Sequence, residues 1–130
     1  MTYRVSYDMD EEALPDAEAV SAFFDKRAHR IAPHGRRANA YWIGPAGGED
    51  IMRVDMDYDA GRAALRWLPD NSHGVELEPG APIVVLESSD HPPVTIPGTL
   101  ARVSIDLAHA AVAAYIQTGQ RPSTVVWAAG

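Results

Sequence analysis

A chain of 130 residues with 46% apolar and 22% charged residues is typical of a globular domain, so we expect a single domain over residues 1–130. Because the chain has no cysteine, it cannot hold a disulfide framework, a thiolate metal site or a cysteine nucleophile. Its net charge of −7 argues against a free-standing nucleic-acid-binding protein, which normally presents a basic patch. The charge suits a basic partner, although it would also serve solubility alone.

The N-terminal residues predict neither a signal peptide nor a membrane span. They lack a positively charged region followed by an apolar run, and no apolar stretch approaches the roughly 20 residues that a membrane helix needs. The lack of cysteine is compatible with a reducing compartment. We therefore expect a cytoplasmic protein without membrane contact.

The first third of the chain predicts a strand, a loop and a helix. Apolar and polar residues alternate from Tyr3 to Tyr7, which is the pattern of a half-buried strand. Residues 8–12 form an acidic run without a strong apolar anchor, and we expect a solvated loop there. Asp16 can cap a helix whose apolar stripe ends near His29.

A basic region follows this helix. It could contact phosphate or nucleic acid, or it could balance the charge of the helix C-terminus and the acidic N-terminal segment. We favour charge balance, because no aromatic residues for base stacking are interleaved with the basic ones. The basic residues are Arg27, His29, Arg30, His34, Arg36 and Arg37.

The middle of the chain predicts strands. Residues 38–43 form a strand candidate, and residues 51–68 form a β-hairpin in the middle of the sheet, with its turn at Asp59 to Gly61. The composition of residues 69–74 predicts a loop. The continuous apolar run at residues 82–86 predicts a strand covered on both faces, and residues 94–96 a short edge strand.

The end of the chain predicts a helix, a turn and a strand. Ser104 is a suitable N-cap, and Gly119 can take the left-handed position that ends a helix. Pro122 cannot continue that helix, and residues 124–127 are β-branched and aromatic, as in a strand. We expect an α+β fold, with an antiparallel or mixed sheet of about five to seven strands and an N-terminal and a C-terminal helix packed on it.

Three carboxylates share one face of the predicted hairpin: Asp55, Asp57 and Asp59. Their spacing matches the start of a calcium loop, but Ala60 and Arg66 stand where that loop needs glycine and glutamate. Calcium is therefore not expected. The balancing charge could come from Arg62 or Arg66 across the hairpin, or from basic residues of a partner.

No arrangement of residues selects a catalytic or metal site. The five histidines lack the spacing of zinc ligands, and the chain has neither a nucleophile elbow nor a glycine-rich phosphate loop. We expect a protein that is not an enzyme and holds no metal or cofactor. Trp42 and Trp127 are expected in the core, whereas Trp67 could be an exposed anchor for a partner.

Two motifs resemble a known family. The run Thr118-Gly-Gln-Arg-Pro-Ser-Thr-Val-Val-Trp127, behind an alanine-rich helix, resembles the C-terminal signature of Immunity protein family one of bacterial polymorphic toxin systems. The run from Tyr58 to Trp67 resembles the family's hairpin in the middle of the chain. Length and element order fit as well, so the resemblance covers nearly the whole chain.

The resemblance implies a protein that binds and neutralises a toxin domain made by the same cell. In that family the toxins are mainly nucleic-acid deaminases, whose basic cleft an acidic surface could occupy. We expect the hairpin to occlude that cleft through Asp55, Asp57, Asp59, Trp67, Asp70, Glu76 and Glu78. The signature residues Gly119, Arg121, Pro122 and Trp127 are expected to hold the fold.

Two other interpretations stay open. The chain could be a small enzyme or a small-molecule-binding domain, with a pocket between the sheet and the C-terminal helix. It could also be a structural subunit that self-associates, and a homodimer is compatible with either the toxin-binding or the structural interpretation.

Overall fold

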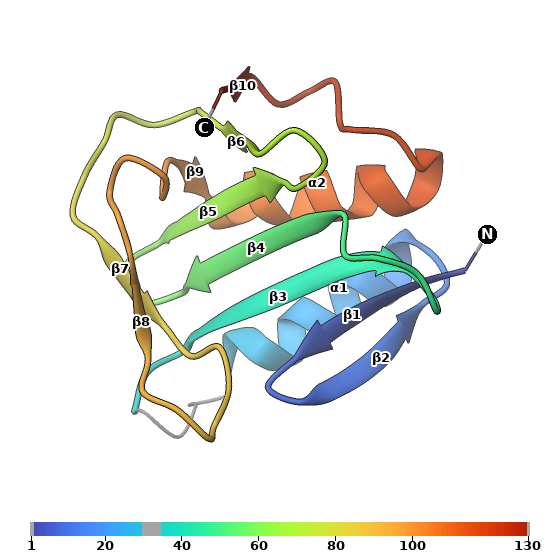
Figure 1. Cartoon of the computed structure of the whole chain (residues 1–130), viewed down its shortest axis with the longest axis horizontal. Helices are drawn as coiled ribbons and strands as arrows, with labels where there is room; N and C mark the ends of the chain where they lie inside the picture. Colours follow the sequence, from blue (N-terminus) through green and yellow to red (C-terminus); the bar gives the residue numbers. More distant parts are fainter. Residues whose placement is uncertain (1, 30–34, 130) are drawn as a thin grey trace.

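The computed structural model describes residues 2–29 and 35–129 and confirms the α+β fold, with two helices packed on a mostly antiparallel sheet (Figure 1). In chain order the elements are β1 (Tyr3–Tyr7), β2 (Asp10–Leu14), α1 (Ala17–Ala28), β3 (Ala38–Pro45), β4 (Met52–Asp57), β5 (Arg62–Trp67), β6 (Ser72–Gly74), β7 (Ile83–Val85), β8 (Val94–Ile96), β9 (Val103–Ser104), α2 (Ile105–Thr118) and β10 (Trp127–Ala128). Neither of these helices is long and apolar enough to cross a membrane.

The main sheet is built outward from the β4–β5 hairpin, which lies in its middle as predicted. Within the described ranges its strand order is β10-β6-β5-β4-β3-β1-β2, and β9 also pairs with β5. β9 pairs at the start of β5, whereas β6 pairs at its end. The hairpin therefore has paired neighbours on both sides and does not protrude from the sheet.

One face of the sheet packs against both helices, which lie behind the sheet in Figure 1. Both predicted N-caps are confirmed, because Asp16 accepts the Ala19 N–H and Ser104 accepts the Leu107 N–H. Gly119 ends α2 in the left-handed conformation, with φ of 71°. The buried residues at the centre of this layer come from four strands and both helices: Val5, Phe24, Tyr41, Val54, Leu65 and Val112.

Part of the opposite face is covered by β7 and β8, which form a separate two-stranded sheet. Ile83 and Val85 are buried there and Val84 between them is half-buried, so the apolar run forms a strand that is covered more completely on one face than on the other. β7 belongs to the second sheet, and Leu86 after it forms a parallel bridge with Asn39 of β3. The main sheet presents Ala38, Ala40 and Ala64 to this layer. Their small side chains allow the second sheet to lie close to the first.

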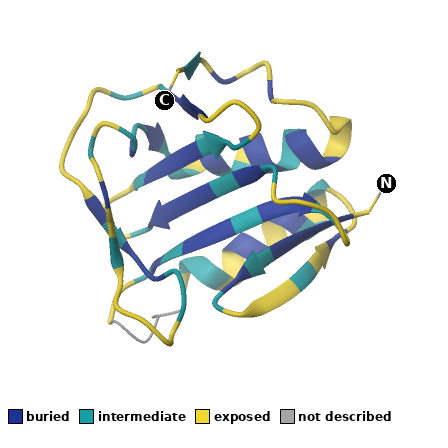
Figure 2. Ribbon diagram, in the orientation of Figure 1, coloured by how far each residue is buried: buried dark blue, intermediate teal, exposed yellow. Residues whose placement is uncertain are grey.

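Three boundaries differ from the prediction. The prediction of a loop for the acidic run at residues 8–12 is wrong, because Asp10–Leu14 forms an edge strand that is mostly exposed (Figure 2). Carboxylates are tolerated at an edge and discourage pairing with other chains. Ser72–Gly74 forms a strand inside the expected loop, because it pairs with Trp127–Ala128. The last strand begins only at Trp127, although Val125 before it is buried.

Candidate functional site

Asp55, the first predicted contact residue, is fully buried and cannot reach a partner. Its carboxylate is bound by Arg53 Nη2 at 2.9 Å and by Arg66 Nη2 at 3.0 Å. Arg53 also pairs with Glu87 Oε2 at 2.8 Å, and its guanidinium lies 4.9 Å from the centre of the Trp42 ring. Burial alone would lower the pKa of Arg53, but the hydrogen bonds to Asp55 and Glu87 outweigh this effect and raise it. The balancing charge thus comes from the chain itself.

Asp57 is also buried, and it shapes the hairpin turn instead of facing a partner. Its Oδ1 accepts the backbone N–H groups of Asp59 and Ala60 at 3.1 and 3.0 Å. This satisfies two donors of the turn, in which Gly61 takes a positive φ of 69°. Asp55 and Asp57 are therefore removed from the predicted contact surface.

Asp59 is exposed but already paired. Its Oδ1 accepts hydrogen bonds from Arg37 Nε at 3.0 Å and Nη2 at 2.8 Å, and these bonds lower the pKa of the carboxyl. Arg27 pairs with Glu12 Oε2 at 2.8 Å, and Arg36 Nη1 lies 3.9 Å from Asp57 Oδ2. The basic region thus balances nearby carboxylates, as favoured above. Its members Arg30 and His34 lie outside the described residues.

The opposite end of the hairpin holds Trp67 and Asp70 and meets the signature turn, by which we mean residues 119–127. Asp70 Oδ2 accepts from Arg121 Nη1 at 3.0 Å, while its Oδ1 accepts from the Ser72 hydroxyl at 2.6 Å. The Ser72 hydrogen bonds are the main cause that lowers the pKa of Asp70. The Arg121 guanidinium lies 5.4 Å from the centre of the Trp127 ring. Residues distant in sequence are thereby brought to one place.

The tryptophans at this end are half-buried and in mutual contact. Trp127 donates its Nε1–H to Pro122 O at 2.9 Å, and its ring centre lies 6.3 Å from that of Trp67. Trp67 also meets Tyr115 of α2 edge to face at 5.5 Å. Trp67 is therefore not the freely exposed anchor that its sequence context suggested, and Trp127 is not fully in the core. Trp42, on the other face, is half-buried as well.

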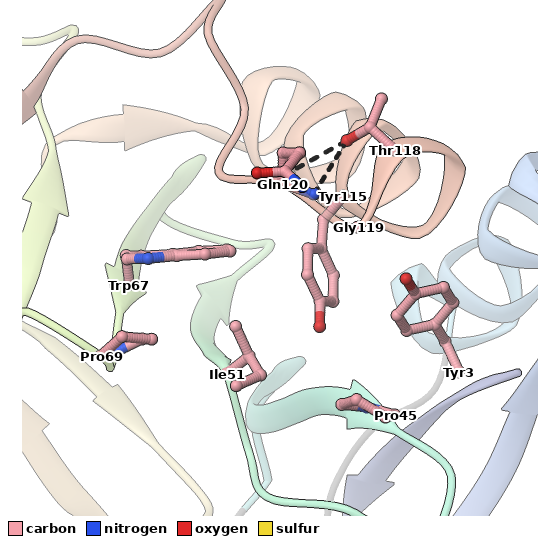
Figure 3. Close-up of a pocket in the computed structure, with 9 residues that line it drawn as sticks. All are labelled: Tyr3, Pro45, Ile51, Trp67, Pro69, Tyr115, Thr118, Gly119 and Gln120. Carbon is pink, nitrogen blue, oxygen red and sulfur yellow. Dashed lines mark hydrogen bonds between the residues drawn. The ribbon is translucent and has the colours of Figure 1, made fainter. Parts of the chain in front are cut away.

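A pocket of about 430 Å³ lies between this end of the sheet and the C-terminal end of α2 (Figure 3). Nine of the described residues line it, from the start of β1, the ends of β3, β5 and α2, the signature turn, the residue before β4 and the β5–β6 loop. Tyr115 reaches from α2 toward Pro45 and Ile51, with Trp67 and Tyr3 on either side of it. The alternative interpretation placed a pocket between the sheet and the C-terminal helix, and this pocket lies there.

Three residues that line the pocket, Tyr3, Tyr115 and Thr118, carry hydroxyl groups, and Gln120 and Trp67 add an amide and an indole N–H. Thr118 Oγ1 is used inside the chain, where it donates to Ala114 O at 3.0 Å and accepts from Gln120 N at 3.1 Å. The hydroxyls of Tyr3 and Tyr115 make no hydrogen bond to any other described residue. Burial, and after it the neighbouring Tyr3, raises the pKa of Tyr115, so this phenol stays protonated. The site can thus exchange hydrogen bonds with a bound group.

Glu76 and Glu78 lie away from the pocket, on the segment that follows β6. Glu76 Oε1 accepts the Ser104 N–H at 2.7 Å, which places it at the start of α2. Glu78 is exposed and makes no contact of this kind within the described ranges. The predicted contact residues therefore do not form one surface: Trp67 and Asp70 lie at one end of the hairpin, and Asp59 at the other.

The surplus negative charge lies on the surface. Several exposed carboxylates form no ion pair with any described residue, and two short groups stand out, one along α1 and one around the start of α2. These carboxylates are Asp10, Asp16, Glu18, Asp25, Glu49, Glu76, Glu78 and Asp106.

Neither the charged side chains nor a sequence comparison assigns a function directly. Across residues 2–29 and 35–129, no group of three or more His, Asp or Glu side chains could hold a metal ion. No protein-family model and no curated protein matches the chain. The likeness of residues 118–127 to the signature of Immunity protein family one therefore stays an expectation.

Proposed function

We propose that the chain is a cytoplasmic immunity protein that binds a cognate bacterial toxin domain, a nucleic-acid deaminase, and neutralises it by covering its active-site cleft. The observation that carries the proposal is the set of exposed carboxylates that form no ion pair with any described residue, added to the resemblance of the signature turn. A toxin that binds nucleic acid needs a basic cleft, and unpaired carboxylates complement such a cleft and speed association.

The contact surface proposed here differs from the predicted hairpin surface. Asp55 and Asp57 are buried, and both strands of the hairpin are paired on their outer edges. We place the contact instead on three exposed carboxylates near the start of α2, Glu76, Glu78 and Asp106, which we call the acidic patch. Arg102 lies beside this segment and donates to the Leu77 carbonyl at 2.8 Å. Glu76 binds the backbone two residues before Asp106, and Glu78 follows on an irregular segment that can adapt to a partner.

The test is a pair of charge reversals measured by surface plasmon resonance against the proposed cognate toxin domain. Glu78→Lys with Asp106→Lys should lower the association rate by about ten-fold or more and flatten its salt dependence. The matched control is Glu18→Lys with Asp25→Lys. Each pair changes the net charge equally, includes one acidic residue in the first turn of a helix, and disrupts no hydrogen bond or ion pair within the described ranges.

The control pair should leave the rate within about two-fold, because distant charges are screened. If the control pair slows association and the patch pair does not, the contact surface has been assigned to the wrong helix. If the unmodified, folded protein binds no toxin domain, the immunity proposal fails.

A second candidate function is favoured by the pocket itself. Its volume of about 430 Å³ lies within the range of roughly 300–1,000 Å³ typical of small-molecule sites. We propose a small-molecule-binding domain as the alternative. Native mass spectrometry of the purified protein tests this alternative. An adduct that is retained under native conditions and disappears on denaturation would support a bound small molecule. A protein that shows no adduct under gentle native conditions would count against a tightly bound ligand.

A further inference from the structure

We propose that the pocket between the sheet and α2 binds an uncharged aromatic molecule of one or two rings. The inference names the ligand class for the second candidate function and does not depend on the toxin proposal. It rests on the walls of the pocket, on its unused hydroxyls and on the lack of charge among its lining residues.

The walls are made of rings and rigid apolar groups. Trp67 and Tyr115 stand edge to face, and Ile51, Pro45 and Pro69 complete the surface around them (Figure 3). Aromatic rings favour offset or edge-to-face contacts with further rings. Such walls match a flat, unsaturated molecule better than a flexible chain, which would lose more conformational freedom on binding.

Hydroxyl groups give the pocket its specificity. The hydroxyls of Tyr3 and Tyr115 have no protein partner within the described ranges, and the Tyr3 ring centre lies 5.1 Å from that of Tyr115. A phenol hydroxyl both donates and accepts. A ligand with one N–H or O–H group on its ring can therefore bond here, whereas a pure hydrocarbon leaves both hydroxyls unused.

None of the described residues that line the pocket carries a charge at neutral pH. Two ion pairs lie beside lining residues and are already closed: Arg121 with Asp70 at 3.0 Å, and Arg4, which lowers the pKa of the Tyr115 phenol, with Asp50 at 2.8 Å. A carboxylate or ammonium group placed on the ligand ring would lose hydration without gaining a counter-ion. The pocket thus discriminates against charged rings.

The signature turn keeps the pocket in shape before any ligand arrives. Gly119 lines the pocket, and a Cβ atom at this position would lie 2.8 Å from the Tyr3 hydroxyl. The glycine therefore leaves room for that hydroxyl. Trp127 packs beside Trp67 and bonds to Pro122, which fixes the turn against the sheet. Preorganisation of this kind raises affinity by lowering the ordering cost of binding.

The experiment uses unlabelled indole as the probe and isotope-labelled full-length protein in NMR titrations. Indole should shift the Trp67 side-chain N–H signal in a saturable manner, while the signal of Trp42 on the opposite face stays unchanged. Indole-2-carboxylate keeps the rings and adds a charge, and it should bind at least about ten-fold more weakly. Tyr115→Phe should weaken indole binding by about two- to ten-fold through loss of one hydrogen bond.

Two matched variants test the location. Gln120→Phe places a ring at the pocket and should weaken indole binding by about ten-fold or more, whereas Gln117→Phe on the exposed side of α2 should leave it within about two-fold. Both positions are exposed, so both variants should fold. Equal effects of these variants, a shift that does not saturate, or a shift of Trp42 as large as that of Trp67 would overturn the proposal.

The outcomes separate the proposals from one another. An adduct in native mass spectra without indole binding overturns the ligand class and leaves the ligand-binding function standing. If the unmodified protein does not bind indole and Gln120→Phe abolishes toxin binding, the pocket is a contact site for the partner protein. That result overturns the proposal of an aromatic ligand.

Discussion

The two ends of the β4–β5 hairpin differ in where their polar groups find partners. At the turn end, Asp57 and Asp59 are bonded within the chain, and next to them Asp55 is buried between two arginines. At the open end, the phenols of Tyr3 and Tyr115 lack partners within the described ranges and face a pocket. The carboxylates that looked functional in the sequence are structural, whereas the open end holds a pocket whose described lining residues are uncharged and where we propose that a ligand binds.

The largest effect on stability is expected for Asp55→Asn. It leaves Arg53 and Arg66 around a neutral group in a buried position, so the free energy of unfolding should fall by about 3–5 kcal/mol. Urea denaturation followed by circular dichroism measures it. Asp59→Asn, at the exposed end of the same carboxylate series, should have a much smaller effect. Equal effects of the two variants would mean that burial does not distinguish these carboxylates.

The next effect concerns the glycine at the open end. Gly119→Ala forces a Cβ into the left-handed region and against the Tyr3 hydroxyl, and should lower the free energy of unfolding by about 1–3 kcal/mol. Gly47→Ala is the matched control, because Gly47 has a similar φ of 75° but open space around an added Cβ. Adding Tyr3→Phe should remove the difference between them. A difference that persists would show that the hydroxyl does not limit this position.

A pH-dependent effect is expected at the turn end. His109 stacks on Phe24 at 4.7 Å, and its Nε2 lies 3.0 Å from the Tyr58 hydroxyl. Burial lowers the pKa of His109 below 6.5, against a raising effect of Asp106 and Asp25. The unfolded chain therefore binds more protons below pH 6.5, so stability is full above this pH and declines as pH falls through it.

The measurement is the free energy of unfolding from above pH 6.5 downward, for the unmodified protein and for His109→Gln. The variant should show a shallower decline. Part of the decline in the free energy of unfolding with falling pH should persist in this variant, because burial also lowers the pKa of His73. The exposed His91→Gln is the control and should keep the original slope. An identical decline in His109→Gln and the unmodified protein would contradict the assignment.

The smallest effect is expected for the ion pair on the signature turn. Arg121 and Asp70 are both exposed, and exposed pairs add little to stability because water and salt screen them. Arg121→Lys keeps the charge but loses the stacking on Trp127, and should lower the urea midpoint only slightly, with little change in high salt. A loss as large as that of Asp55→Asn would make this turn a main support of the fold.

Local signals in the sequence predicted a good part of the fold. Ser104 and Gly119 define both ends of α2 through capping chemistry that involves only near neighbours. The hairpin turn likewise follows from the residues Asp59 to Gly61, although the part that Asp57 plays in it was not predicted. The edge strand β2 was missed because an edge tolerates the carboxylates that in isolation indicate a loop.

The site was less accessible to sequence reasoning, because it depends on contacts between distant residues. Alternation placed Asp55 on one face of the hairpin, but nothing local showed that Arg53 and Glu87 would enclose that face. The pocket joins Tyr3 at the start of the chain to Tyr115 near its end. Tyr3 was expected on the apolar face of a strand, and only the tertiary structure shows that its ring packs against that of Tyr115.

The most direct test of the proposed function measures neutralisation. The proposed cognate toxin domain would be assayed for deamination of single-stranded nucleic acid, with increasing amounts of this protein and with the Glu78→Lys, Asp106→Lys variant. We predict complete inhibition at an equimolar ratio, and weaker inhibition by the variant. Full deaminase activity in the presence of a large excess of the folded protein would contradict the account.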